Sequence, residues 1–331
     1  MNPENPVSML AASVVVGASL LVASPVQAQS YYPSRPITLV VPFVAGGPVD
    51  SIARIMADGM RSSLGQPIIV ENVTGAGGSI GTARVARAEP DGYTISVGNW
   101  GTHVANGAIY SLPFDLLADF TPVALLPREP LTIVARKSMP ADNLKDLIAW
   151  LKANPGKALC ANSGIGGPSH VGGLLFAKQT GTQFQSVPYR GAMPAMQDLL
   201  AGRVDMMIAG PSVALAQVRS GNLKAYAVAA GRRLSAAPDI PTVDEAGLPG
   251  FYVTVWHGMW VPKGTPIDAI NKLNIAVRDA LAQPAVRNRF ANLFLEIPPV
   301  DQETPDALGL HQKAEIEKWW PIIKAANIEA K

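Results

Sequence analysis

Short turns rich in glycine follow several apolar runs of the sequence, and these turns are where the chain could do chemistry. The segment 40–60, VVPFVAGGPVDSIARIMADGM, passes from an apolar run through AGGP into a helical pattern. Similar turns stand at 73–81 (VTGAGGSIG), 99–103 (NWGTH) and 162–170 (NSGIGGPSH). A helix N-terminus presents unpaired N–H groups and the positive end of the helix dipole, so each turn is suited to hold an anion.

These turns lack the spacing of the common catalytic motifs. GAGGSIG at 75–81 misses the dinucleotide fingerprint by one place, and GPSHV at 167–171 lacks the last glycine of a nucleophile elbow. The histidines are scattered: His103, His170, His257 and His311. Cys160 is the only cysteine and lies in an apolar run. We therefore predict no metal site, no cofactor and no disulfide, with Cys160 buried and inert.

The first 28 residues read as a secretory signal cut after Ala28, because a short apolar stretch ends in small residues. The segment carries Glu4 and no Lys or Arg, so a membrane anchor stays an alternative. Its removal takes away one acid and leaves 27 basic and 24 acidic side chains, a net charge of +3. A balance this small gives no electrostatic footprint for nucleic acid. The expected location is the periplasm.

The elements that must position these turns alternate along the chain. From residue 36 onward, short runs rich in Val and Ile alternate with helical patterns, which is typical of βαβ units on largely parallel sheets. Two long extended runs, 121–138 and 251–264, enclose a block with its own βαβ series, and the helical patterns 267–283 and 304–326 follow. This order predicts two α/β lobes with mixed, mostly parallel sheets joined by two crossover strands. We expect lobe 1 at 29–135 and 251–331 and lobe 2 at 136–250.

With these motifs in place, the mature chain resembles the periplasmic solute-binding proteins of tripartite tricarboxylate transporters, the Bug (TctC-like) proteins. The resemblance is carried in order by YPSRPITLVVPFVAGGPVDSIAR, GQPIIVENVTGAGGSIGTARVARAEPDGYTISVGN, THVANGAIY, SGIGGPSHVGGLLF, VPYRGAMPAMQDLLAGRVDMM, GNLKAYAVAAGRRLSAAPDIPTVDEAGLPGF and WVPKGTP. It implies a periplasmic binding protein-like fold that closes on a small carboxylate, held by backbone amides, hydroxyls and waters. It implies no catalysis, and a partner in the membrane components of the transporter; we expect a monomer. The contacts it implies come from both lobes: Ala45, Gly46, Gly47, Pro48, Ser163, Gly166, Ser169 and His170.

Further candidates depend on the residues of this chain: Val49, Trp100, Thr102, His103, Trp256 and His257. Val49 stands where the family often has Thr, and Trp100 where it often has a small residue. Both make the pocket more apolar, and an indole could form a flat wall for a ring. We therefore expect an aromatic carboxylate, with the dicarboxylate terephthalate as the best single candidate.

Other roles stay open for several of these residues. Trp100 could be a core residue, Trp256 could pack at the hinge, and Thr102 could cap a helix. Arg190 in VPYRG offers a bidentate fork, but we expect a surface or interlobe role for it, and a structural role for Asp205. An alternative function is a periplasmic sensor or an enzyme acting on a small carboxylate, although no nucleophile and base pair supports catalysis.

Overall fold

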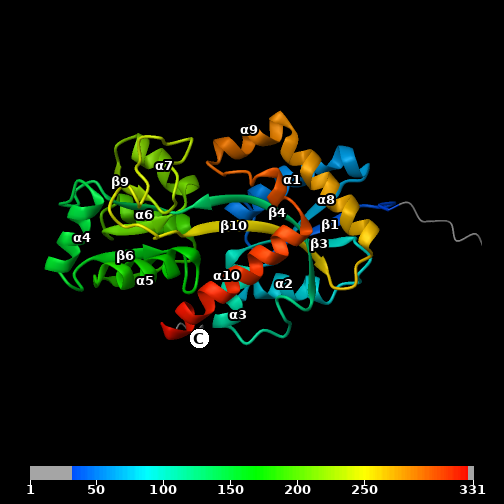
Figure 1. Cartoon of the computed structure of the whole chain (residues 1–331), viewed down its shortest axis with the longest axis horizontal. Helices are drawn as coiled ribbons and strands as arrows, with labels where there is room; N and C mark the ends of the chain where they lie inside the picture. The colour runs from blue at the N-terminus through cyan, green and yellow to red at the C-terminus, as the bar shows by residue number, and fades with distance from the viewer. Residues whose placement is uncertain (1–31, 327–331) are drawn as a thin grey trace, which may run out of the picture. The chain divides into compact units, whose positions relative to one another are not determined.

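Two α/β lobes, each built on a mixed five-stranded sheet, make up the part of the chain described by the computed structural model, residues 32–326 (Figure 1). The predicted two-lobe α/β fold is therefore confirmed. The expected signal segment 1–28 lies outside the described residues. Within 32–326, no helix has the length and apolar character needed to cross a bilayer.

The glycine-rich turns at 45–48, 73–81 and 99–103 follow strands of the first sheet. Its strands are β1 (Ile37–Val41), β2 (Ile68–Asn72), β3 (Thr94–Asn99), β4 (Phe120–Pro130) and β10 (Thr254–Pro262). Their order is β2-β1-β3-β10-β4. β1 is parallel to β2 and β3, whereas β10 is antiparallel to β3 and β4. The carboxyl ends of β1 and β3 therefore share one edge, where the turns after them can meet.

The second sheet repeats this plan with the order β7-β6-β8-β5-β9. Its strands are β5 (Thr132–Arg136), β6 (Leu159–Asn162), β7 (Gln185–Pro188), β8 (Met206–Ala209) and β9 (Leu223–Val228). β6 is parallel to β7 and β8, and β5 is antiparallel to β8 and β9. The turns after β6 and β8 therefore share an edge of this sheet as well.

The chain changes sheets where the two long extended runs meet. The run predicted over 121–138 is divided at Leu131, whose N–H donates to the carbonyl of Val253 at 2.8 Å, just before β10. The Val253 N–H donates in turn to Ala229 of the second lobe. Two adjacent crossings thus join the lobes; the exact boundaries at 135/136 and 250/251 stay a prediction.

Helices cover both faces of each sheet (Figure 1). The helices within 32–326 are α1 (Pro48–Leu64), α2 (Ser79–Ala86), α3 (Asn106–Ile109), α4 (Leu144–Ala153), α5 (Pro168–Thr180), α6 (Ala192–Leu200), α7 (Pro211–Arg219), α8 (Ile267–Ala282), α9 (Pro284–Asn292) and α10 (Pro305–Ala325). α1, α8 and α9 lie on one face of the first sheet, and α2, α3 and α10 lie on the other. In the second lobe, α6 and α7 pack on one face and α4 and α5 on the other.

α1 shows why the first glycine-rich turn is followed by a helix. Pro48 occupies the first helical position, where its missing N–H costs nothing, and Gly65 ends the helix with a φ of 68°. Ile52, Ile55 and Met56 are buried on one face, in the core that also holds apolar residues of α8. The helix start is therefore fixed by local sequence and by burial of this face.

Candidate functional site

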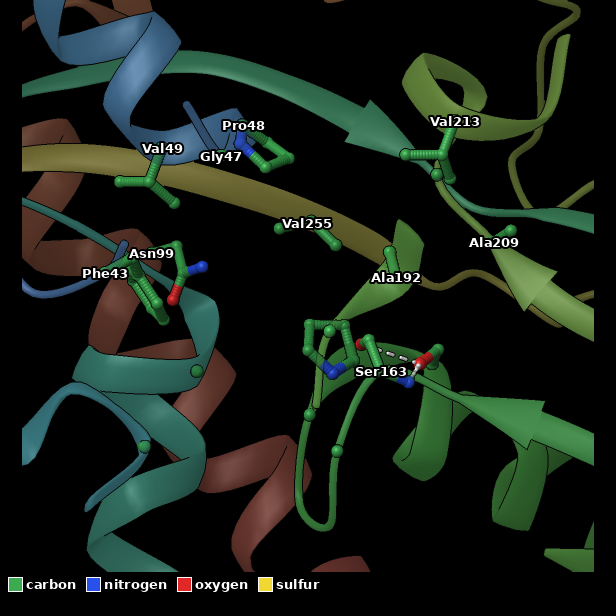
Figure 2. Close-up of a pocket in the computed structure, with 18 of the residues that line it drawn as sticks. Phe43, Gly47, Pro48, Val49, Asn99, Ser163, Ala192, Ala209, Val213 and Val255 are labelled. Carbon is green, nitrogen blue, oxygen red and sulfur yellow. Dashed lines mark hydrogen bonds between the residues drawn. The ribbon is translucent and has the colours of Figure 1, made fainter. Parts of the chain in front are cut away.

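A pocket of about 340 Å³ is lined by both lobes. The segments that line it follow the carboxyl ends of β1, β3, β6 and β8, and β4 and β10 contribute residues as they pass between the sheets. Figure 2 shows Pro48 and Val49 at the start of α1, Ser163 on the loop before α5 and Val255 of β10 around one space. This is where open α/β sheets bind ligands.

The first of the turns predicted to hold an anion leads into α1. Gly47, Pro48 and Val49 line the pocket, and the first-turn N–H groups after Pro48 have no acceptor within the helix. Gly46 does not line it; its N–H donates to Asp50 Oδ2 at 2.8 Å. Ala45, also predicted, does not line it either.

Asp50 holds this turn in place. Its carboxylate also accepts hydrogen bonds from Arg54 Nε and Asn72 Nδ2, both at 2.9 Å. Burial alone would raise the pKa of Asp50, but these bonds and the one from Gly46 outweigh it and lower the pKa. Asp50 is therefore an ionised anchor, and sequence reasoning did not select it.

Another of the turns predicted to hold an anion leads into α5. Ser163, Gly166 and Ser169, which the family resemblance implied as contacts, line the pocket. Ser169 Oγ accepts from the Ser163 N–H at 2.8 Å and lies 2.9 Å from Ser163 Oγ. His170 does not line the pocket; its Nδ1 accepts the Gly166 N–H at 3.0 Å. Because Nδ1 accepts, the ring is neutral, and burial lowers the pKa of His170 accordingly.

A third helix start, that of α7, is already occupied by a side chain of the protein. Glu129, on β4, lines the pocket and is 6% exposed. One of its carboxylate oxygens accepts from Ser212 Oγ at 2.8 Å and from the Ser212 N–H at 3.4 Å. Burial raises the pKa of Glu129, and the bonds from Ser212 offset this only partly. Sequence reasoning missed Glu129; an acid inside the apolar run VALLPREPLTIVAR was the available signal.

Trp100, Thr102 and His103 lie in the core and not on the pocket. Trp100 is 2% exposed and packs edge-on against Trp319, with ring centroids 5.3 Å apart. His103 stacks on Trp260 at 3.6 Å, and Thr102 Oγ1 lies 2.9 Å from His103 Nδ1. A π-helical turn, Gly101–Ala105, follows Trp100; Trp100 packs on α10, and His103 packs on Trp260 of β10 and Phe120 of β4. The predicted aromatic wall from Trp100 is therefore absent from the lining.

Trp256 and His257 are neighbours on β10 and point to opposite faces of the sheet. Successive side chains of a strand point to opposite faces. Val255 and His257 line the pocket, whereas Trp256 is 1% exposed and its indole N–H donates to Glu315 of α10 at 3.1 Å. His257 Nδ1 donates to the Pro127 carbonyl at 2.7 Å, and burial lowers the pKa of His257 to about 4. The ring is uncharged at neutral pH.

Positive side chains are missing from the pocket lining in the described part of the chain. Arg190 does not line it, and Asp205 forms an ion pair with Arg136 at 2.8 Å, which agrees with the structural role expected for it. No cluster of His, Cys, Asp and Glu within 32–326 could hold a metal. Cys160 is buried, and burial raises its pKa to about 12. Helix N-termini, hydroxyls and the Asn99 side-chain amide are thus donors available to an anion here.

Known proteins resemble this chain over nearly all of its length. The profile described as "Tripartite tricarboxylate transporter family receptor" (TctC) matches residues 52–328. Protein BugT of Bordetella pertussis is 36% identical over 329 residues, which cover 99% of this chain and 100% of BugT. The structure of periplasmic binding protein BugD is 40% identical, with a TM-score of 0.80, over 90% of this chain and 100% of that one.

Two further structures contain carboxylates. MatC from Rhodopseudomonas palustris with bound malate is 40% identical, with a TM-score of 0.80, over 88% of this chain and 100% of that one. An R. palustris protein with adipate is 31% identical, with a TM-score of 0.82, over 90% of this chain and 100% of that one. The predicted family is confirmed: the chain belongs to the TctC or Bug family of periplasmic solute-binding proteins, which are receptors of tripartite tricarboxylate transporters and not enzymes.

Proposed function

We propose that this chain, in the periplasm, binds a small carboxylate between its lobes as a monomer and delivers it to the membrane components of a tripartite transporter. The observation that carries the proposal is a pair of helix N-termini, those of α1 and α5, on one pocket that contains no Lys or Arg among its described lining residues. Their N–H groups, with the Ser163 and Ser169 hydroxyls, suit a carboxylate. The relatives whose structures hold malate and adipate support the same ligand class.

The ligand is proposed to be aromatic, although the support comes from side chains other than Trp100 and Trp256. Phe43 and Tyr110 line the pocket, together with apolar residues such as Val255. An aromatic pair adds about 0.5 to 1.5 kcal/mol beyond the burial of its area. Terephthalate is the reference ligand for this part of the proposal, and its second carboxylate would enter a pocket that already contains Glu129.

Closure of the two lobes on the ligand is also part of the proposal. The two lobes, each with its own sheet, would move about the crossings that meet at the Leu131 to Val253 hydrogen bond. Few backbone positions cross between the sheets, which is the arrangement that permits hinge closure.

A screen of carboxylates tests the proposed function. The panel contains malate, adipate, benzoate and terephthalate, each paired with its neutral amide as the matched control. A ligand at 100 times its dissociation constant adds about 2.7 kcal/mol to the folded state, so thermal unfolding should shift upward with at least one acid and not with its amide. Equal shifts with every acid and its amide would rule out this function.

Substitution of Gly47 tests the turn before α1. A Cβ at Gly47 would meet only Val44, with its carbonyl oxygen 3.3 Å away, and the φ of −77° suits any residue. Gly47→Val should therefore fold normally while its branched side chain obstructs the pocket. We expect carboxylate affinity, measured by calorimetry, to fall at least about tenfold, or about 1.4 kcal/mol.

The matched control for this variant is Gly46→Ala. Gly46 has a φ of 79° and does not line the pocket. Its substitution should cost about 1 kcal/mol of folding free energy through backbone strain and leave affinity nearly unchanged. Unchanged affinity in Gly47→Val would show that this turn is only a tight connection between β1 and α1.

A further inference from the structure

Glu129 is the one acidic side chain among the described residues that line the pocket. No Lys or Arg within 32–326 forms an ion pair with it, and Ser212 supplies its only hydrogen bonds there. A buried carboxylate without a cationic partner is costly, because desolvation is offset only by hydrogen bonds. The ligand is therefore the remaining source of a partner for this carboxyl group.

The fold accommodates this carboxylate specifically. A Cβ at Gly210 would lie 2.7 Å from both carboxylate oxygens of Glu129, so the glycine leaves the space that they fill. Ser212 stands in the first turn of α7, where the helix dipole favours a negative charge. The Glu129 carboxyl group thus occupies the anion site at the start of α7. The starts of α1 and α5 are the helix starts that can still bind a ligand carboxylate.

His257 adds a second acceptor to the same lining. Its Nδ1 hydrogen is donated to the Pro127 carbonyl at 2.7 Å, so Nε2 of the neutral ring can only accept a hydrogen bond. The pocket therefore combines helix starts that donate hydrogen bonds with side chains that accept them. A ligand with a carboxylate at each end can accept hydrogen bonds from the helix starts, but it has no hydrogen to donate to Glu129 or His257.

We infer that Glu129 selects a ligand that carries an ammonium group in addition to its carboxylate, so that the pocket prefers amino carboxylates to dicarboxylates. This inference rests on the proposed carboxylate-binding function. The ammonium group pairs with Glu129, and the ligand carboxylate binds at the starts of α1 and α5. A cation beside Glu129 compensates its burial, whereas a second ligand carboxylate is repelled by it.

Matched ligand pairs test the inference by calorimetry. Each pair shares a skeleton and differs in one end: succinate with 3-aminopropanoate, glutarate with 4-aminobutanoate, adipate with 5-aminopentanoate, and terephthalate with 4-(aminomethyl)benzoate. The series of lengths covers different separations between Glu129 and the helix starts. In the wild type, at least one amino carboxylate should bind about tenfold or more tightly than its dicarboxylate partner.

Variants assign that preference to Glu129. Glu129→Gln should reduce the preference about tenfold or more, because it weakens binding of the amino carboxylate and removes the repulsion of the dicarboxylate. Glu71→Gln is the matched control, because it removes the same charge from β2, outside the pocket, and should leave every affinity unchanged. If thermal unfolding shows that Glu129→Gln is not folded, Glu129→Asp takes its place. It keeps the carboxyl group on a shorter side chain, farther from the ligand, and should weaken binding of the amino carboxylate alone.

The outcomes separate this inference from the proposed function. Dicarboxylates that bind the wild type more tightly than their amino partners would overturn the inference and leave carboxylate binding intact; that result would mean that a protonated Glu129 donates to the ligand. A preference for amino carboxylates that persists in the Glu129 variants would overturn the role of Glu129. Wild-type protein that binds no member of either series would overturn both.

Discussion

Replacement of Asp50 by alanine is expected to lower the free energy of unfolding by about 3 kcal/mol and to weaken carboxylate binding at least about tenfold. The Asp50 side chain is 3% exposed and accepts hydrogen bonds from the Gly46 N–H, Arg54 Nε and Asn72 Nδ2. Its removal leaves these donors without their acceptor and releases the turn before α1. Stability and binding should therefore fall together.

Urea denaturation and calorimetry on the same preparations measure the two effects. Arg54→Met is the matched control, because it removes the partner that is half-exposed to water and leaves the bonds from Gly46 and Asn72. It should cost much less stability and little affinity. An Asp50→Ala protein that binds carboxylates like the wild type would show that the turn keeps its shape without this anchor.

The features that local sequence determines were predictable. Gly-Pro pairs at 47–48 and 167–168 start α1 and α5, because proline fits the first helical position and glycine permits the turn before it. Alternating strand and helix patterns placed these starts at the carboxyl edges of two sheets. Ser163 and Ser169 were contacts implied by the family resemblance, and both line the pocket at the second of these starts.

The features that depend on tertiary packing were not predictable from the same signals. A π-helical turn at Gly101–Ala105 adds a residue to the helical turn; Trp100 packs on Trp319 of α10 and His103 stacks on Trp260 of β10. Nothing in NWGTH distinguishes this turn from an ordinary helix start. Strand alternation does predict that Trp256 and His257 face opposite sides, but the choice of side depends on α10, which covers Trp256 through Glu315.

Glu129 was missed because its partner is remote. Ser212 lies 83 residues further along the chain, on a different lobe. In an isolated sequence, an acid between two prolines in an extended run is as compatible with an exposed edge as with a pocket. Only the pairing of β4 with β10 and the start of α7 at Gly210 bring this carboxylate into the pocket.

Acid is expected to destabilise the protein strongly between pH 7 and pH 5, chiefly through two buried histidines. Burial lowers the pKa of His103 to about 3 and that of His257 to about 4, against about 6.5 in an unfolded chain. The unfolded state therefore binds protons first, so this stability is fully present above pH 6.5 and is lost as the pH falls below it. By pH 5, each histidine accounts for about 2 kcal/mol.

His103→Phe should remove about half of this loss. His103 Nε2 has no hydrogen-bond partner among the described residues, and the ring stacks on Trp260, so protonation would place an unpaired charge in the core. Phenylalanine keeps the stacking and cannot titrate. Urea denaturation at pH 8, 7, 6 and 5 should give the variant the shallower dependence on pH.

Phe120→Leu is the matched control for this prediction. Phe120 packs edge-on against His103, with ring centroids 5.4 Å apart, so its substitution disturbs the same cluster and retains the titrating ring. Its effect on the free energy of unfolding should be equal at all four pH values. Carboxylates titrate alike in the wild type and both variants, so the difference between proteins isolates the ring. Parallel pH curves for His103→Phe and the wild type would mean that His103 gains its proton without leaving the folded core.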